Sequence, residues 1–456
     1  MKIVVLNGSP KGDVSVTMQY VAYIRKKFPD HTYDILNVAA EIKKIEKDTA
    51  TWHKILENIR SADLVLWAFP LYYLVVCAQY KRFIELIFER KAQDAFAGTY
   101  AASLSTSIHY FDQTANAYIQ AISDDLGMKF LGFYSAEMRD LLQEEEQKRL
   151  GKFTSLLITA VREKIPVQRE NAPLVWPALS YIPGAPQKTV NAGAKKVVIL
   201  TDDDGSSPNL SAMTTRLFRT LSGSVEMINL HNLNIKGGCL GCCQCGYDNT
   251  CVYTDGYVDF FKSKLVPADI IIMAGSVHDR YLSSTWKQFF DRSFFKGHVP
   301  GLKGKQIGFV IAGPLHQIPC LKEALTAWAD NGMCHAQFVT DEVSGSGDLD
   351  ALLDTLAARL VQCSDAGYIP PRTFYAVGGH KIFRDSIYGV LRLAFQADYR
   401  YYQKHALFDF PHADLKTRCF NAILIPLTRI PGFRKKVFAD IKHHMVQPFE
   451  SVLRDA

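Results

Sequence analysis

The chain has 456 residues, 48% of them apolar and 21% charged, and a formal net charge of +6. These values are typical of a folded globular protein with two or three domains, and they exclude a largely disordered chain. The sequence shows neither a cleavable targeting segment nor an apolar run near the ~20 residues that a membrane span needs. We therefore expect a cytoplasmic protein.

Apolar strands and amphipathic helices alternate through the first third of the chain. Buried strands joined by helical crossovers predict a parallel sheet covered by helices on both faces. Five such units indicate a doubly wound α/β domain, which we place at 1–163. The predicted strands are 2–7, 32–37, 63–69, 98–105 and 129–135.

The turn after the first strand is rich in glycine and hydroxyl groups. Gly8 and Gly12 permit a tight turn in which backbone N–H groups and the next helix N-terminus face one point and bind an anion. Asp13 follows Gly12 where an NTP-binding loop requires lysine, which argues against an NTPase. Hydroxyl groups suit a monophosphate, because they can bind it without a metal. The polar side chains of this turn include Ser9, Lys11, Ser15 and Thr17.

Two later loops complete a family resemblance. The third predicted strand ends in Pro70-Leu71-Tyr72-Tyr73, and the fourth ends in a polar loop that reaches His109. With the first turn, these loops make residues 1–150 resemble flavodoxin-like NAD(P)H-dependent FMN reductases. The resemblance implies FMN at the carboxyl ends of the strands, and it assigns no catalytic acid or base. The implied FMN-binding residues are Ser9, Lys11, Ser15, Val16, Thr17, Pro70, Leu71, Tyr72, Tyr73, Ser105, Thr106 and His109.

A proline-rich linker, 164–193, precedes a second copy of the domain at 194–365. The evidence for duplication is that four residues recur at an offset of 206 positions. Ala62, Asp63, Lys81 and Phe83 correspond to Ala268, Asp269, Lys287 and Phe289. The strands of the second copy are predicted at 196–201, 224–229, 268–274, 305–312 and 335–341.

Five of the ten cysteines lie between 239 and 251, in an additional loop of the second copy. Clustered cysteines in a cytoplasmic protein favour a metal or redox site over disulfides. The C-x2-C-x2-C-x5-C spacing could wrap around a compact [4Fe–4S] cluster, which is our prediction. A zinc site and redox-active thiols are the alternatives. The predicted ligands are Cys239, Cys242, Cys245 and Cys251, and Cys243 is surplus.

The position of this loop, after the second strand of a flavodoxin-like domain, resembles the iron–sulfur flavoproteins of anaerobes. That resemblance implies one FMN and one cluster that exchange electrons between neighbouring subunits. The second copy departs from the pattern, since Asp202, Asp203 and Asp204 occupy its phosphate turn and would repel a phosphate. We therefore predict a division of labour, in which the first copy holds FMN, the second holds the cluster, and the fused pair imitates a dimer.

The last region, 366–456, is basic and shows helical periodicity. It holds 14 Lys and Arg against 7 Asp and Glu. We expect a helical appendage packed over the two domains. Its charge could instead attract NADPH phosphate or an acidic electron partner, and its apolar residues could make a peripheral contact with a membrane. No known motif supports nucleic-acid binding.

The predicted fold class is α/β, with two tandem flavodoxin-like, doubly wound five-stranded parallel sheets plus a C-terminal helical region. The predicted function is an FMN-dependent oxidoreductase passing electrons between NAD(P)H or a ferredoxin-like donor, FMN and a [4Fe–4S] cluster. A non-enzymatic electron-transfer flavoprotein and a flavin-only quinone or nitro reductase with a structural zinc loop are the alternatives. The expected partners are small-molecule or protein electron donors and acceptors, and a homodimer is left open.

Overall fold

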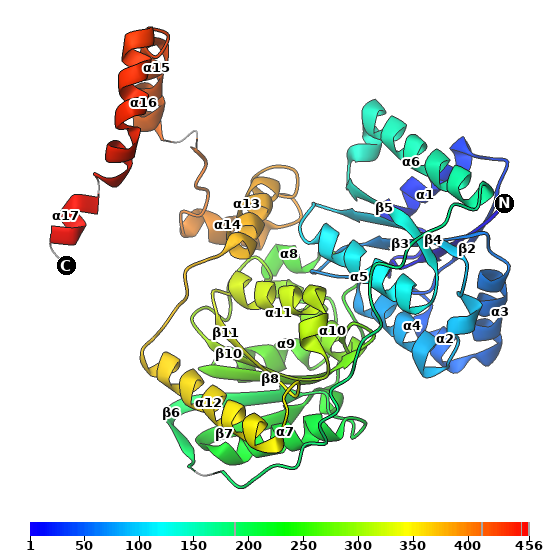
Figure 1. Cartoon of the computed structure of the whole chain (residues 1–456), viewed down its shortest axis with the longest axis horizontal. Helices are drawn as coiled ribbons and strands as arrows, with labels where there is room; N and C mark the ends of the chain where they lie inside the picture. Colours follow the sequence, from blue (N-terminus) through cyan, green and yellow to red (C-terminus); the bar gives the residue numbers. More distant parts are fainter. Residues whose placement is uncertain (187, 412–413, 448, 455–456) are drawn as a thin grey trace. The chain divides into compact units, whose positions relative to one another are not determined.

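The computed structural model describes residues 1–186, 188–411, 414–447 and 449–454. The chain divides into two compact units, Met1–Tyr399 and Arg400–Ala456. The first unit contains two α/β domains, each built on its own parallel sheet (Figure 1). The domain boundary predicted at 366 lies inside this first unit, which also includes helix α13 (Phe374–Tyr388).

The first sheet has five parallel strands in the order β2-β1-β3-β4-β5. This order is that of a doubly wound flavodoxin-like sheet, whose ligands bind beyond the carboxyl ends of the strands. The strands are β1 Lys2–Asn7, β2 Thr32–Leu36, β3 Leu64–Pro70, β4 Tyr100–Ser107 and β5 Lys129–Glu137. The helices of this domain are α1 Val16–Lys27, α2 Ile42–Lys47, α3 Thr49–Arg60, α4 Ala78–Glu89, α5 Asp112–Asp125 and α6 Glu144–Arg162.

The second sheet repeats this order, with the parallel strands arranged β7-β6-β8-β10-β11. An additional two-residue strand, β9, pairs antiparallel with the end of β8 and was not predicted. β6 begins at Val190, so the last four residues of the predicted linker belong to the sheet. The strands are β6 Val190–Thr201, β7 Leu221–Asn229, β8 Ile270–His278, β9 Tyr281–Leu282, β10 Gln306–Ala312 and β11 His335–Thr340.

The helices of the second domain cover both faces of its sheet (Figure 1). They are α7 Pro208–Thr220, α8 Cys245–Asp248, α9 Tyr257–Phe260, α10 Ser284–Arg292, α11 Pro319–Asn331 and α12 Ser346–Asp365. The side chains explain several helix starts. Ser15 caps α1 by accepting from the Met18 N–H, and Ser283 caps α10 by accepting from the Trp286 N–H. Pro208 opens α7, where its missing N–H costs nothing.

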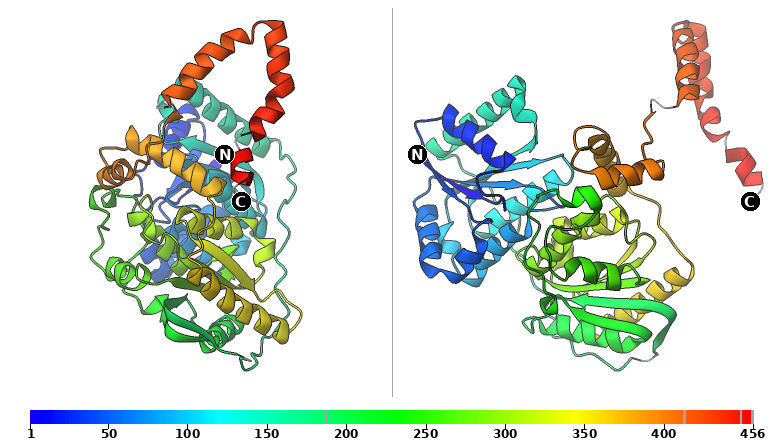
Figure 2. Two further views of the ribbon diagram at one scale, coloured as in Figure 1. Left: turned by 90° about the vertical axis from the view of Figure 1, so that its left-hand side faces the viewer. Right: turned by 180° about the vertical axis from the view of Figure 1, so that it is seen from behind.

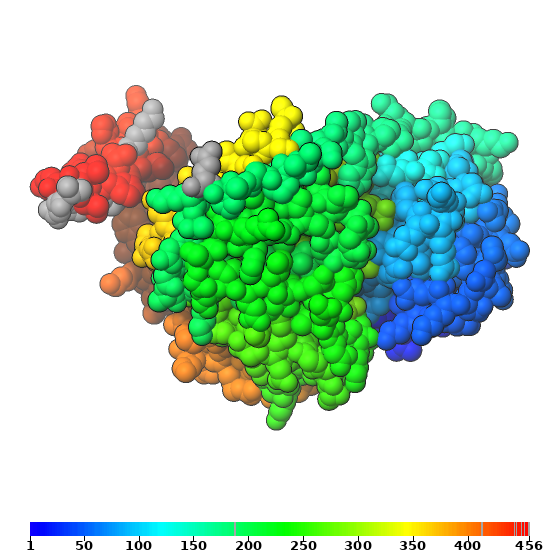
Figure 3. Space-filling view, turned by 90° about the horizontal axis from the view of Figure 1, so that it is seen from below, coloured from blue at the N-terminus to red at the C-terminus, as the bar shows by residue number. Residues whose placement is uncertain are grey.

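One continuous apolar core joins the two domains. It combines buried residues of α3, α4 and α5 with residues of α10 and α11, for example Ile84 and Phe289. Separate clusters fill the outer layers, under α1 and α6 in the first domain and under α7 and α12 in the second. Figure 3 shows the two domains packed directly against each other. The domain contact is therefore part of the folded core.

The contact repeats the internal duplication, because α4 of the first domain packs on α10, its counterpart in the second. The Ala78 N–H donates to Asp291 Oδ2 at 2.7 Å, and at the equivalent positions the Ser284 N–H donates to Glu85 Oε1 at 2.5 Å. Such reciprocal bonds are typical of an isologous dimer interface. The two halves of one chain thus meet as two subunits of a symmetric dimer would.

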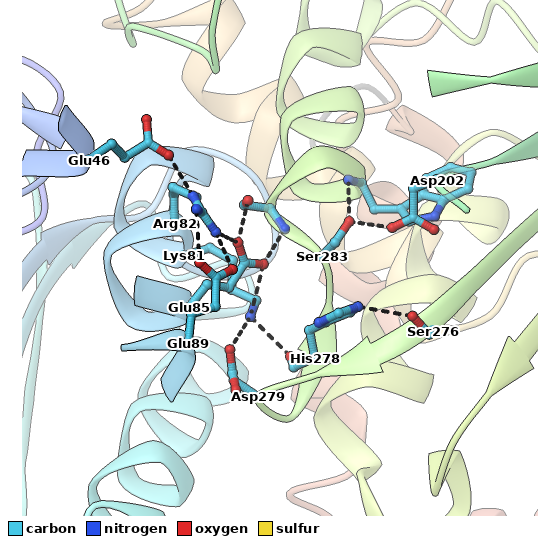
Figure 4. Close-up of polar contacts among 12 residues, drawn as sticks. Glu46, Lys81, Arg82, Glu85, Glu89, Asp202, Ser276, His278, Asp279 and Ser283 are labelled. Carbon is cyan, nitrogen blue, oxygen red and sulfur yellow. Dashed lines mark hydrogen bonds and ion pairs between the residues drawn. The ribbon is translucent and has the colours of Figure 1, made fainter. Parts of the chain in front are cut away.

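The buried charges of this interface are also reciprocal. Lys81 Nζ donates to the His278 carbonyl at 3.0 Å, and Lys287 Nζ donates to the Tyr73 carbonyl at 3.1 Å. Lys81 forms an ion pair with Glu85 at 3.4 Å, part of the network in Figure 4, and Lys287 pairs with Asp291. All four charged side chains lie in residues that are at most 3% exposed. Lys81 has a second carboxylate partner in Asp279, and Glu85 has a second cation in Arg82. Removing Lys287 or Asp291, in contrast, would leave its partner buried without a counter-charge.

The second compact unit is helical. It contains the end of α14 (Gln396–Lys404) and the helices α15 Leu415–Leu427, α16 Pro431–Val446 and α17 Phe449–Arg454. The helical character predicted for 366–456 is confirmed by helices α13 to α17. No helix within the described residues is both long and apolar enough to cross a membrane.

Candidate cofactor site

The turn between β1 and α1 forms an anion-binding geometry. The Lys11 N–H donates to Ser9 Oγ at 3.2 Å, and the Gly12 N–H donates to the Ser9 carbonyl at 3.1 Å, which folds the chain back on itself. Gly12 has a positive φ of 57°, which favours glycine. The first N–H groups of α1, at Val16 and Thr17, have no partner inside the helix and lie at its positive end. The turn therefore suits a phosphate group.

The loop after β3 lies beside this turn. Pro70 ends the strand, and the Leu71 N–H donates to the Thr106 carbonyl of the neighbouring β4 at 2.9 Å. The Lys11 ammonium lies 5.6 Å from the centre of the Tyr72 ring. Burial raises the pKa of Tyr72, and the neighbouring Ser9 hydroxyl offsets this only in part. The structure thus brings together Ser9, Lys11 and Tyr72, three of the residues implied for FMN binding.

Tyr73 faces a different surface. Its carbonyl accepts from Lys287 of the second domain, and its ring contacts Phe294 edge-on at 6.4 Å. Burial raises the pKa of the Tyr73 hydroxyl. Tyr73, although part of the candidate flavin loop, therefore contacts the second domain, while Tyr72 remains near Lys11.

The residues at the end of β4 divide between the site and the core. Thr106 Oγ1 lies 2.6 Å from Thr17 Oγ1, which ties β4 to the phosphate turn. Ser105 is fully buried and accepts from Asn116 Nδ2 at 2.9 Å, so its hydroxyl already has an internal partner. His109 has a positive φ of 59° and is partly exposed. Of these three residues, Thr106 is therefore the one that contacts the start of α1 directly, through Thr17.

A hydrogen-bonded chain orients His109. Its Nδ1 lies 2.8 Å from Asp112 Oδ2, and the Ser135 hydroxyl donates to the same oxygen at 2.6 Å. Burial raises the pKa of the Asp112 carboxyl, but the bonds from Ser135 and His109 outweigh it and hold the pKa below its usual value. Asp112 is therefore an ionised acceptor that holds the imidazole of His109 in place.

The cysteine loop of the second domain lies between β7 and α9. Cys239, Cys245 and Cys251 are partly buried and Cys242 is exposed, and none of the ten cysteines, all within the described residues, forms a disulfide. Burial raises the pKa of Cys239 to about 12, with smaller contributions from Asp291 and the neighbouring thiols. Burial and the four other thiols of the loop likewise raise the pKa of Cys245. Ionising these thiols together therefore requires a cation among them.

The thiols of the cysteine loop do not surround a common metal position in the structure. Among the described residues, no three His, Cys, Asp or Glu side chains are grouped closely enough to hold a metal ion. The loop is rich in glycine: Gly241 adopts a positive φ of 62°, and Gly237 and Gly238 precede the first cysteine. Four free thiols on one glycine-rich loop are the donor set that an iron–sulfur cluster uses. The predicted ligand set remains a prediction.

The base of this loop is clamped by a buried ion pair. Arg292 Nη2 lies 2.8 Å from Asp255 Oδ1, and both side chains are fully buried. The Lys236 N–H donates to Asp255 Oδ2 at 2.9 Å, and Arg292 Nη1 donates to the Gly237 carbonyl at 3.1 Å. The two ends of the cysteine loop are thus held to each other and to α10.

The cysteine loop packs directly on the candidate flavin loop of the first domain. A β-carbon on Gly241 would lie 2.3 Å from the Tyr72 ring, and one on Gly238 would lie 2.7 Å from Gln79 Oε1. Gln79 Nε2 donates to the Cys239 carbonyl at 3.2 Å. The Tyr72 hydroxyl and Gln79 Oε1 are buried and have no hydrogen-bond partner among the described residues. Sequence reasoning missed Gln79, since no motif marks it.

The strand ends of the second domain line a space that Pro10 of the first turn and Gly238 of the cysteine loop also border. A cavity of about 890 Å³ lies between the domains and is lined by residues that include Asp202, Asp204, His231, Ser276 and His278. Figure 4 shows Asp202 beside Ser283, and His278 Nε2 lies 2.9 Å from Ser276 Oγ. Burial raises the pKa of Asp202, and its bonds offset this only in part. After its first strand, the second domain thus has carboxylates where the first domain has hydroxyl groups.

Comparisons with known proteins match each domain separately. The family model described as a flavodoxin-like fold matches residues 1–153, and the model described as NADPH-dependent FMN reductase matches residues 197–348. An iron–sulfur flavoprotein of Archaeoglobus fulgidus is 31% identical over 106 residues, which cover 23% of this chain and 47% of that protein. The match therefore spans about half the length of that curated relative.

Two solved structures illustrate the structural neighbours. A crystal structure of an NADH:FMN oxidoreductase in its apo form is 17% identical, covers 35% of this chain and 89% of that chain, and has a TM-score of 0.31. The flavoenzyme NAD(P)H:acceptor oxidoreductase FerB of Paracoccus denitrificans is 16% identical, covers 36% of this chain and 97% of that chain, and has a TM-score of 0.30.

Proposed function

We propose that this chain, in which a flavodoxin-like domain is followed by a domain of the NADPH-dependent FMN reductase family, is an oxidoreductase with its two redox groups on different domains. FMN would bind to the first domain and a [4Fe–4S] cluster to the cysteine loop of the second. The observation that carries the proposal is the contact between Gly241 and Tyr72, which joins the two candidate sites. The partial match to an iron–sulfur flavoprotein supports the same pairing.

The first domain has the groups that an FMN phosphate needs. The N–H groups at the start of α1 would bind its oxygens, with the hydroxyls of Ser9, Ser15 and Thr17 around them. The ammonium of Lys11 would offset its charge. The Tyr72 hydroxyl, near Lys11, and Gln79 Oε1, beside Gly238 of the cysteine loop, have no hydrogen-bond partner among the described residues, and the polar edge of a flavin would satisfy them. The residues present therefore fit the cofactor.

The second domain would hold the cluster through Cys239, Cys242, Cys245 and Cys251. FMN exchanges two electrons and an iron–sulfur cluster exchanges one, so the pair can connect a two-electron donor to a one-electron partner. The donor would be NAD(P)H or a ferredoxin-like protein. The polypeptide would contribute the alignment of the two sites, through the α4–α10 interface and the Asp255–Arg292 clamp.

The composition of the purified protein tests the proposal. Protein prepared without oxygen should contain about one FMN and about four irons with sulfide per chain. NAD(P)H should bleach its flavin absorbance and support turnover with an artificial acceptor. Zinc in place of iron would instead indicate a flavin-only reductase with a structural loop. Flavin that neither nucleotide reduces would indicate an electron carrier, and two FMN per chain would contradict the division of labour.

A substitution at the loop contact tests electron passage between the sites. Gly241→Ala should retain iron and FMN but slow reduction of the cluster by flavin roughly tenfold or more, because the new methyl group separates the Tyr72 ring from the cysteine loop. Gly193→Ala is the matched control, since Gly193 also has a positive φ but has nothing near its missing β-carbon. Equal rates in stopped-flow measurements on both variants would refute the role of this contact.

A further inference from the structure

The second compact unit, Arg400–Ala456, exposes apolar side chains that its described residues do not cover. Helix α15 has no buried residue. Ile423, Ile425 and Ile430 are 66%, 61% and 56% exposed at the tip where α15 turns into α16. The left view of Figure 2 shows the two helices diverging from this turn. Clustered exposed apolar side chains of this kind mark an interaction surface.

Cations surround this apolar tip. Between 415 and 439 the sequence has six Lys and Arg and no Asp or Glu. Arg429 lies in the turn itself, and Arg434, Lys435 and Lys436 follow it in the first part of α16, all exposed. An apolar segment bordered by cations complements a surface whose outer layer is anionic and whose interior is apolar.

The distribution of the apolar residues distinguishes between kinds of partner. A helix that binds in a protein groove presents one apolar stripe, with anchors three or four residues apart. In α15, Phe420 and Ile423 lie on one side of the helix, but Ile425 is also exposed and lies about 200° around the helix from Ile423, on the opposite side. A fluid lipid surface can surround such a helix, whereas one protein groove would leave part of it in water.

We propose that the tip formed by residues 423–430 docks this chain on an anionic phospholipid surface. The isoleucines enter the layer between the headgroups, and the cations from Arg429 to Lys436 contact lipid phosphates. Neither helix crosses the bilayer, since α15 has 13 residues and α16 has 16.

Vesicle binding by the full-length protein tests the proposal. The protein should sediment with vesicles of phosphatidylcholine mixed with phosphatidylserine, and much less with phosphatidylcholine alone. The double variant Ile423→Asp and Ile425→Asp should lose binding to both. The triple variant Arg434→Glu, Lys435→Glu and Lys436→Glu should reduce the partition coefficient on anionic vesicles by on the order of a hundredfold.

Matched controls come from the first domain. The double variant Leu142→Asp and Leu156→Asp changes two apolar residues that are at least as exposed as the two isoleucines, at 82% and 69%, and it should leave vesicle binding intact. Lys26→Glu, Lys47→Glu and Lys54→Glu make the same charge change at exposed positions elsewhere. Equal loss in tail variants and controls would overturn the proposal. A second result would also overturn it: the unaltered protein does not bind anionic vesicles, and the tail variants change its oligomeric state in solution. The tip would then bind another protein chain.

Discussion

In the first domain, the turn after β1 presents Ser9, Lys11 and an exposed helix start, whereas in the second domain the turn after β6 presents Asp202, Asp203 and Asp204. The strands behind the two turns follow the same order and pack through equivalent helices. The scaffold and the interface are therefore alike, and the difference is confined to loops at the strand ends. Loops at strand ends tolerate changes of sequence and charge more readily than the strands behind them.

The largest expected effect concerns the cysteine loop, which only the second domain has. Cys239→Ser should remove nearly all iron while FMN stays bound, because the loop loses a ligand and the first domain does not depend on it. Iron and flavin analysis of protein prepared without oxygen measures this. Cys363→Ser, on α12 and outside the loop, should retain both groups. Full iron content in the first variant would show that Cys239 is not a ligand.

The buried charges at the interface test whether the halves depend on each other. Lys287→Met should lower the free energy of unfolding by roughly 3–5 kcal/mol, since it leaves Asp291 buried without its partner. Denaturation in urea measures the loss. The double variant Lys287→Met and Asp291→Leu should recover much of it, because an apolar pair replaces an ion pair at little cost. A loss below about 1 kcal/mol in the single variant would mean that water solvates the site.

A carboxylate introduced into the first turn tests the electrostatic difference between the domains. Ser15→Asp keeps a residue that caps α1 equally well but adds a negative charge beside the proposed phosphate. At the effective dielectric of a protein surface, like charges about 4 Å apart cost roughly 4 kcal/mol. FMN affinity should therefore fall by at least a hundredfold, measured by flavin fluorescence. Ser15→Asn, which caps without charge, is the control, and an equal fall in both variants would exclude the electrostatic explanation.

The smallest effect concerns the clamp at the base of the cysteine loop. Burial raises the pKa of Asp255, but the bonds from Arg292 and the backbone outweigh it and lower the pKa to about 2. An acid whose folded-state pKa is lowered stabilises the fold above its unfolded pKa and loses that contribution as the pH falls toward 2. The shift corresponds to about 2 kcal/mol at neutral pH.

Asp255→Asn should therefore unfold more easily at pH 7, and its difference from the unaltered protein should narrow between pH 4 and 2. Unfolding free energies across this range measure the effect. Asp259→Asn, at an exposed position on the neighbouring helix, should show no such pH dependence. A difference in unfolding free energy that stays constant down to pH 2 would indicate that the Asp255 side chain stabilises the fold by packing and not by its charge.

Local patterns determined much of the architecture. The apolar strands and their helical crossovers predicted a parallel sheet from residues close in sequence, and the recurrence of Lys81 and Phe83 as Lys287 and Phe289 predicted a second copy of it. The glycine-rich turn and the cysteine spacing were also visible, because turns and ligand spacing depend on neighbouring residues. The short strand β9 was not predicted, since two residues are too few to show periodicity.

Only the tertiary structure decided which parts meet. The sequence marked Lys81 and Lys287 as a repeated pair but did not show that they hold the two domains together. It also did not show that Gly241 approaches Tyr72, that Tyr73 faces the interface, or that Ser105 turns to Asn116. These contacts join positions distant along the chain, and they arise from complementary surfaces that no local spacing or periodicity encodes.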